Sequence, residues 1–146
     1  MQIRDVMTPN AEVIPPSAPV QEAAAKMREL DVGALPVCDG ERLCGVITDR
    51  DVTIRLVADG LDPSQTNIEE IMTPTVEYCF EDQDVEEAAT IMEAHQIRRL
   101  PIVNRDKRLV GILSLGDLAV RTLGTEDQDL AEDTLAEVSE PAQPNR

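Results

Sequence analysis

Hydrophobic positions follow two alternating patterns along the chain. Over residues 20–30 apolar side chains recur every three or four positions, which predicts a helix with one buried face. Two short apolar runs follow, at 35–38 and 43–47, and Asp39-Gly40 between them is typical of a hairpin turn. The pattern therefore predicts a helix, an antiparallel pair of strands, and a second helix that begins at Thr48.

The ends of these helices are indicated by capping residues. Ser17 is the predicted N-cap of the first helix, with Pro19 tolerated in its first turn. Gly60 and Gly124 follow the two later helices and are plausible stop positions. In the second half of the chain, Asp82 is the predicted cap.

The whole pattern occurs twice. The segment Ile-Arg-Asp-Val-Met-Thr-Pro at residues 3–9 recurs as Ile-Glu-Glu-Ile-Met-Thr-Pro at 68–74, and about a third of the aligned positions that follow are identical. The second copy has an extended run at 76–80, a helical pattern from Val85, and apolar runs at 100–103 and 109–113. Each copy therefore has the predicted order β-α-β-β-α.

The chain divides into four parts on this interpretation: repeat 1 (1–60), a linker (61–67), repeat 2 (68–124) and an acidic tail (125–146). One repeat is too small to bury both faces of its sheet. We therefore expect an α/β (α+β) fold in which the tandem repeats pack through their sheets with pseudo-two-fold symmetry.

The chain is strongly acidic. Its 146 residues carry 13 Lys and Arg against 29 Asp and Glu, a formal charge of −16. This balance disfavours binding to nucleic acids or to an anionic membrane surface. No apolar stretch is long enough to span a bilayer, and the N-terminus lacks a signal-peptide pattern, so we expect a cytoplasmic protein.

The tail concentrates this charge, with seven acidic side chains against Arg146 alone. We expect it to be mostly disordered, and a short acidic helix that docks a partner is the alternative.

Little in the sequence suggests catalysis or metal binding. The three cysteines, Cys38, Cys44 and Cys79, are scattered and lie in apolar or mixed runs, which favours free thiols in a reducing compartment. A single histidine, His95, is too little to complete a zinc site with them. No nucleophile has an evident base. We therefore expect neither an enzyme nor a metal protein.

The tandem β-α-β-β-α pattern resembles the cystathionine-β-synthase (CBS) domain pair, or Bateman module. The resemblance rests on the two Met-Thr-Pro segments, the Leu-Pro-Val/Ile strands, and the motifs Gly-Val-Ile-Thr-Asp-Arg-Asp and Gly-Ile-Leu-Ser-Leu-Gly-Asp. It covers residues 1–124 and is closest to small stand-alone CBS-pair proteins. It implies a regulatory module that binds adenosine-type ligands in clefts between the repeats. It also implies a homodimer in which four repeats form a disc.

The family's ligand motif, Gly-h-h-[Thr/Ser]-x-x-Asp (h, hydrophobic), ends at Asp51 in repeat 1 and at Asp117 in repeat 2. Thr48 and Ser114 stand where a helix N-terminus favours a phosphate, and the two aspartates can accept ribose hydroxyls. Ser/Thr-x-x-Asp is also a variant of the capping box, which needs no ligand. The two interpretations are compatible.

Further candidates come from charge and from the family. Arg98 and Arg99 precede a strand of repeat 2, where a basic residue reaches the ligand phosphate in some CBS pairs, and repeat 1 has Gly33 and Ala34 there. The predicted nucleotide site comprises Ile14, Val37, Thr48, Arg50, Asp51, Arg98, Arg99, Ser114 and Asp117.

We expect an adenine nucleotide (AMP, ADP or ATP) as regulatory ligand, no required cofactor, and an unidentified protein effector that receives the signal in trans. A ligand-free dimeric scaffold or stress-response interaction protein is the alternative.

Overall fold

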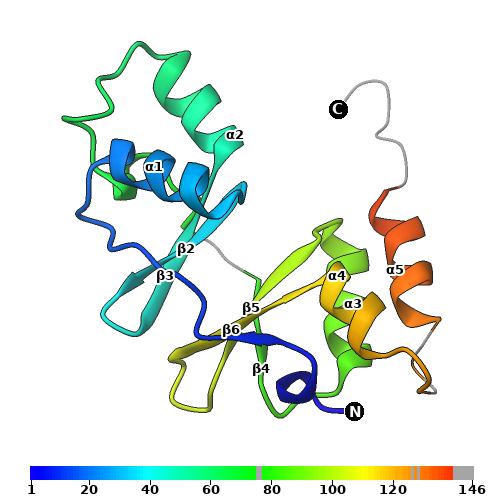
Figure 1. The fold of residues 1–146 in the computed structure, drawn as a ribbon. Helices are drawn as coiled ribbons and strands as arrows, with labels where there is room; N and C mark the ends of the chain where they lie inside the picture. The colour runs from blue at the N-terminus through cyan, green and yellow to red at the C-terminus, as the bar shows by residue number, and fades with distance from the viewer. Residues whose placement is uncertain (75–76, 126, 128, 140–146) are drawn as a thin grey trace. The chain divides into compact units, whose positions relative to one another are not determined.

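The computed structural model describes residues 1–74, 77–125, 127 and 129–139. It confirms a mixed α+β fold with two repeats of helices and sheets (Figure 1). Contacts divide the chain into two compact units: unit 1 contains residues 1–10, 77–106 and 110–146, and unit 2 contains 11–76 and 107–109. The units therefore do not coincide with the sequence repeats, because the first ten residues belong with the second repeat.

Unit 2 is built around a hairpin of β2 (Ala34–Asp39) and β3 (Arg42–Thr48). Helix α1 (Val20–Leu30) precedes the hairpin, and α2 (Asp49–Asp51) follows it and continues as the π-helix η2 (Val52–Val57). The 3-10 helix η3 (Ile68–Glu70) and the residue after it supply Ile68 and Ile71 to the apolar core. The segment that opens the second repeat therefore completes the core of the first.

Unit 1 has a four-stranded sheet in the order β1-β6-β5-β4. Its strands are β1 (Thr8–Pro9), β4 (Cys79–Phe80), β5 (Arg99–Val103) and β6 (Leu109–Ser114). β1 pairs antiparallel with β6, and β4 pairs parallel with β5. Its helices are η1 (Ile3–Asp5), α3 (Val85–His95), α4 (Leu115–Arg121) and α5 (Leu130–Val138).

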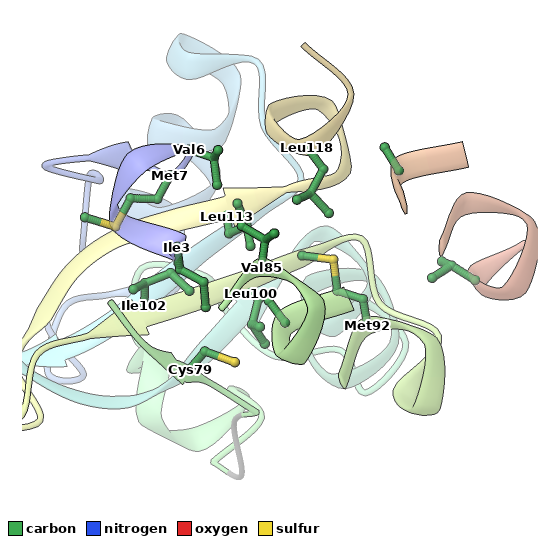
Figure 2. Packing of buried hydrophobic residues seen from close by; sticks show 13 residues of the cluster. Ile3, Val6, Met7, Cys79, Val85, Met92, Leu100, Ile102, Leu113 and Leu118 are labelled. Atoms are coloured by element: carbon green, nitrogen blue, oxygen red, sulfur yellow. The ribbon is translucent and has the colours of Figure 1, made fainter. Parts of the chain in front are cut away.

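The N-terminal segment is part of the core of unit 1. Figure 2 shows Ile3, Val6 and Met7 among side chains of the sheet and of α4, such as Leu113 and Leu118. Ile3 and Val6 are fully buried. The two opening segments, which we call lead-in segments (residues 3–9 and 68–74), are thus exchanged between the repeats.

Two details of the helices differ from the sequence-based expectation. The N-caps of α1 and α3 are Pro19 and Asp84, not Ser17 and Asp82. Asp82 instead pairs with Arg105, with Oδ1 2.7 Å from the guanidinium Nη2, so its carboxylate is not available to cap. The pair holds the pKa of Asp82 below its usual value, chiefly through this hydrogen bond.

The tail also differs. Where a mostly disordered segment was expected, residues 130–138 form α5, which packs on α3 and α4 in unit 1. Ala131 and Val138 join the core there. Their spacing puts them on one helical face, and burial of that face accounts for the helix. Residues 140–146, the end of the predicted tail, lie outside the described residues.

Candidate functional site

Each predicted motif begins a helix in a reciprocal capping box. In unit 2, Thr48 Oγ1 accepts the Asp51 N–H at 3.1 Å, and the Asp51 carboxylate accepts the Thr48 N–H at 3.0 Å. In unit 1, Ser114 and Asp117 make the same two bonds, both at 3.0 Å. The structure therefore has the capping role that the spacing predicted, in both copies.

The aspartates also bind the lead-in segments. The Thr8 hydroxyl donates to Asp117 Oδ1 at 3.1 Å, and the Thr73 hydroxyl donates to Asp51 Oδ1 at 3.4 Å. Sequence reasoning missed both threonines. Their signal was present, because Met-Thr-Pro recurs together with the motif, but the pattern does not show that each threonine serves the other repeat's aspartate.

An arginine at the end of each motif helix strengthens this attachment. Arg55 donates to the carbonyls of Ile71 and Met72, both at 3.2 Å, and Arg121 donates to the carbonyl of Met7 at 2.5 Å. These two arginines occupy equivalent positions of the repeats. The motif helices thus hold the lead-in backbone as well as cap themselves.

The motif glycines make room for the same segments. A Cβ on Gly45 would lie 2.6 Å from the Thr73 carbonyl oxygen, and a Cβ on Gly111 would lie 2.6 Å from that of Thr8. A glycine allows either a ligand or a neighbouring strand to come this close. In the structure a strand-like lead-in segment does so in both units.

Arg98 lies beside the motif of unit 1. Its carbonyl accepts the N–H of Leu115, the first residue of α4, at 3.0 Å. The equivalent carbonyl in unit 2, that of Gly33, accepts the Asp49 N–H at 2.9 Å. The internal symmetry therefore places an arginine side chain next to one motif and none at the matching position of the other.

The three candidate arginines are exposed. Arg98 Nη2 donates to Ser139 Oγ at 3.2 Å. Within the described part of the chain, the guanidinium groups of Arg50 and Arg99 have no hydrogen bond or ion pair. They are therefore the cations of the predicted site that are most available to an anion.

Ile14 and Val37 lie side by side in unit 2 as a parallel bridge, and both are fully buried in its core. They position the strand that leads toward the motif. Their place in the nucleotide site stays a prediction, and neither side chain is exposed, since both lie among the other apolar residues of that core.

The predicted residues thus fall into two groups. Unit 2 contains Ile14, Val37, Thr48, Arg50 and Asp51, and unit 1 contains Arg98, Arg99, Ser114 and Asp117. Both groups include a hydroxyl, a carboxylate and at least one arginine. The group in unit 1 has two arginines and the group in unit 2 has one, and a phosphate requires such local positive charge in so acidic a protein.

Cys38 and Cys79 have the environment of buried apolar residues, and Cys44 is half-buried. Burial raises the pKa of the Cys38 and Cys79 thiols to about 11, so both are protonated near neutral pH and are poor nucleophiles. Among the described residues, no three His, Cys, Asp or Glu side chains gather in a way that could hold a metal ion. None of the helices that the structure describes is long and apolar enough to cross a membrane.

The family match and the similar proteins both identify CBS domains in this chain. The CBS domain matches residues 3–58 and 68–123. The CBS domain-containing protein YhcV of Bacillus subtilis is 41% identical over 124 residues, which cover 85% of this chain and 87% of YhcV. Hypoxic response protein 1 of Mycobacterium tuberculosis is 38% identical over 117 residues, which cover 80% of this chain and 81% of that protein.

Solved structures agree with this result. The crystal structure of Hypoxic Response Protein I with two coordinated zinc ions has a TM-score of 0.75, covering 82% of this chain and 97% of that one at 38% identity. CBSX2 in complex with AMP has a TM-score of 0.69, covering 80% of this chain and 91% of that one at 31% identity. The chain, with two CBS domains that span most of its length, therefore belongs to the CBS domain family and contains a CBS pair.

Proposed function

We propose that the protein is a non-catalytic regulatory CBS-pair module that binds an adenine nucleotide at the Ser114–Asp117 motif of unit 1. One observation carries the proposal: Arg98 and Arg99 are exposed beside this motif, whereas the equivalent positions in unit 2 are Gly33 and Ala34. A phosphate would gain two guanidinium partners here, and arginine can hold it through paired hydrogen bonds.

The carboxylate of Asp117 can accept further hydrogen bonds, as from the hydroxyls of a ribose. It accepts the Ser114 N–H and the Thr8 hydroxyl, and an ionised carboxylate has about four lone-pair sites. Asp117 is also partly exposed, whereas Asp51 is 7% exposed. These differences favour unit 1 over unit 2 as the nucleotide-binding unit. The solved complex of the related CBSX2 with AMP supports an adenine nucleotide as the ligand class.

The direct test is calorimetric titration of AMP, ADP and ATP into the protein and into the variant Arg99→Ala. Arg99 has no described side-chain partner, so its removal should leave the fold intact and weaken nucleotide binding by about tenfold. Arg28→Ala is the matched control, because Arg28 is an exposed arginine on α1 of unit 2. Equal affinities for Arg99→Ala and the parent would refute the assigned site.

We also propose that the module acts as a homodimer and signals to a partner in trans. The supporting observation is an exposed apolar pair at equivalent positions of the two repeats: Ile54 and Val57 on η2 in unit 2, and Val120 on α4 with Leu123 just after it in unit 1. Val57 is 64% exposed, Val120 69% and Leu123 65%, so each would gain free energy from burial against a second surface. Val120→Lys should shift the mass measured by light scattering toward the monomer.

A ligand-free scaffold is the second candidate. It is favoured by the capping boxes, because both motif aspartates already have partners inside the chain. If none of the three nucleotides bound while the dimer persisted, this function would be the better description.

A further inference from the structure

Helix α5 has no counterpart after the first repeat. It follows α4 and packs on α3 and α4 of unit 1, where Ala131 and Val138 join the core. After η2 in the first repeat, residues 58–67 contain no helix before η3. The two units therefore differ by an added element, and that element belongs to the unit that has the arginine pair.

Two side-chain contacts fix α5 against unit 1. The Thr134 hydroxyl lies 3.3 Å from Glu93 Oε1 of α3 and 2.7 Å from the Leu130 carbonyl oxygen of α5, so its one proton is shared between these two acceptors. At the end of the helix, Ser139 Oγ accepts from Arg98 Nη2 at 3.2 Å. Arg98 is the residue whose carbonyl receives the first N–H of α4. The C-terminal end of α5 thus reaches the border of the Ser114–Asp117 motif.

The charge of α5 makes this position significant. The helix carries Glu132, Asp133 and Glu137 and no basic residue. Its C-terminal carbonyl groups add further negative potential near Arg98. An anion that approached Arg98 while α5 was docked would meet the negative potential at the C-terminal end of that helix, and the hydroxyl of Ser139 would hold the guanidinium in another direction.

We propose that α5 is an intramolecular competitor that lowers the affinity of the unit 1 site for anionic ligands by engaging Arg98. The proposal rests on the proposed function, because it concerns regulation of that same site. Docked α5 and a bound phosphate oppose each other through one shared guanidinium and through like charges. By linkage, the factor by which a bound ligand weakens the docking of α5 equals the factor by which docked α5 weakens ligand binding. Removal of α5 should therefore strengthen ligand binding.

The test uses AMP as the probe and calorimetry as the readout, on the full chain and three variants. Ser139→Ala removes the acceptor and should tighten AMP binding by about two- to tenfold. Ser139→Asp places a carboxylate beside Arg98 and should weaken it by a similar factor. The matched control is Ser17→Ala, because Ser17 is an exposed serine in unit 2. Opposite effects of Ala and Asp at one position are not expected from loss of packing.

A chain that ends at Asp129 tests the whole helix. It should bind AMP at least as tightly as Ser139→Ala, and circular dichroism checks that it is folded. Hydrogen exchange on the full chain should also show faster exchange of the α5 amides when AMP is bound.

AMP binding that is equal in the parent, Ser139→Ala and Ser139→Asp, with unchanged exchange in α5, would overturn this inference and leave the proposed function standing. Absence of AMP binding in every chain, the truncated one included, would overturn both.

Discussion

The substitution Gly111→Ala tests whether the lead-in segment of residues 3–9 is held by close backbone contact. The added Cβ would lie 2.6 Å from the Thr8 carbonyl oxygen and 2.9 Å from Met7 Sδ. Real Cβ atoms essentially never come closer than 3.0 Å to such neighbours, so the segment must move away from β6. The Thr8 carbonyl belongs to β1, which pairs with β6, so it cannot swing aside as a free side chain would.

The expected cost is about 1–3 kcal/mol of unfolding free energy, the usual range for overpacking in a filled interior. Complete detachment of the segment would instead expose Ile3 and Val6, each worth about 1.5–3 kcal/mol when buried. A loss above about 4 kcal/mol would therefore indicate that the segment has left the sheet, and a smaller loss would indicate that it has only shifted.

The matched control is Gly116→Ala, in the same motif. Its Cβ would meet only Ser114 Oγ, at an ordinary 3.5 Å. Because alanine is the better helix former, this change should be neutral or stabilise by up to about 1 kcal/mol. Urea unfolding followed by circular dichroism suits a chain without tryptophan. An unfolding free energy of Gly111→Ala that equals that of Gly116→Ala would refute the argument that close backbone contact holds the segment.

Three further outcomes are expected. Ser114→Ala should cost about 1 kcal/mol in urea unfolding through loss of the helix cap, and a cost no different from that of an exposed serine would contradict the capping box. Arg121→Met should lower the unfolding free energy and speed hydrogen exchange in residues 3–9, because its guanidinium donates to the Met7 carbonyl; unchanged exchange would show that the contact does not hold the segment. Burial raises the pKa of Cys38 and Cys79 from 9.0 to about 11, so between these values the thiols ionise in the unfolded state but not in the folded state. The contribution of each thiol to the free energy of unfolding is therefore complete below pH 9 and should fall by about 1 kcal/mol at pH 10. The Cys38→Ala, Cys79→Ala double variant should lose less stability over this range, and an equal loss would refute the assignment.

The elements of the fold were predictable because their signals are local. The helix at 20–30 was predicted from its apolar spacing and occupies those residues in α1. The two motif helices begin after Thr48 and Ser114, as the capping pattern indicated. Asp82 was a poor guide to the start of α3, because a carboxylate can cap or form an ion pair, and Arg105 lies 23 residues away in sequence.

The exchange of the lead-in segments was not predictable from the repeat alone. A repeat specifies which residues are equivalent, but either copy of Met-Thr-Pro could fit beside either glycine. The choice depends on chain connections that periodicity does not record. A helix in the acidic tail was only the alternative expectation, and there as one that docks a partner, because the acidic composition favoured disorder. Its packing on α3 and α4 of the same chain depends on a few small and apolar residues that this composition hid.

The candidate site was predictable at the level of residue types. Thr48, Asp51, Ser114 and Asp117 do lie together in pairs, because their spacing is that of one helical turn. The further partners of the two aspartates are distant in sequence, since Thr8 is 109 residues from Asp117 and Thr73 is 22 residues from Asp51. Contacts of that separation have no signature in a single sequence beyond the recurrence of the threonine itself.

The exchanged lead-in segments make each repeat depend on the other for a complete core. Residues 3–9 begin the first repeat and complete the core of unit 1, and residues 68–74 begin the second repeat and complete the core of unit 2. A chain cut between residues 60 and 68 would therefore give two fragments that each lack a piece of their own core. The same fragments, mixed, could restore both cores by strand donation, so the chain has the topology of two domain-swapped single repeats joined into one polypeptide.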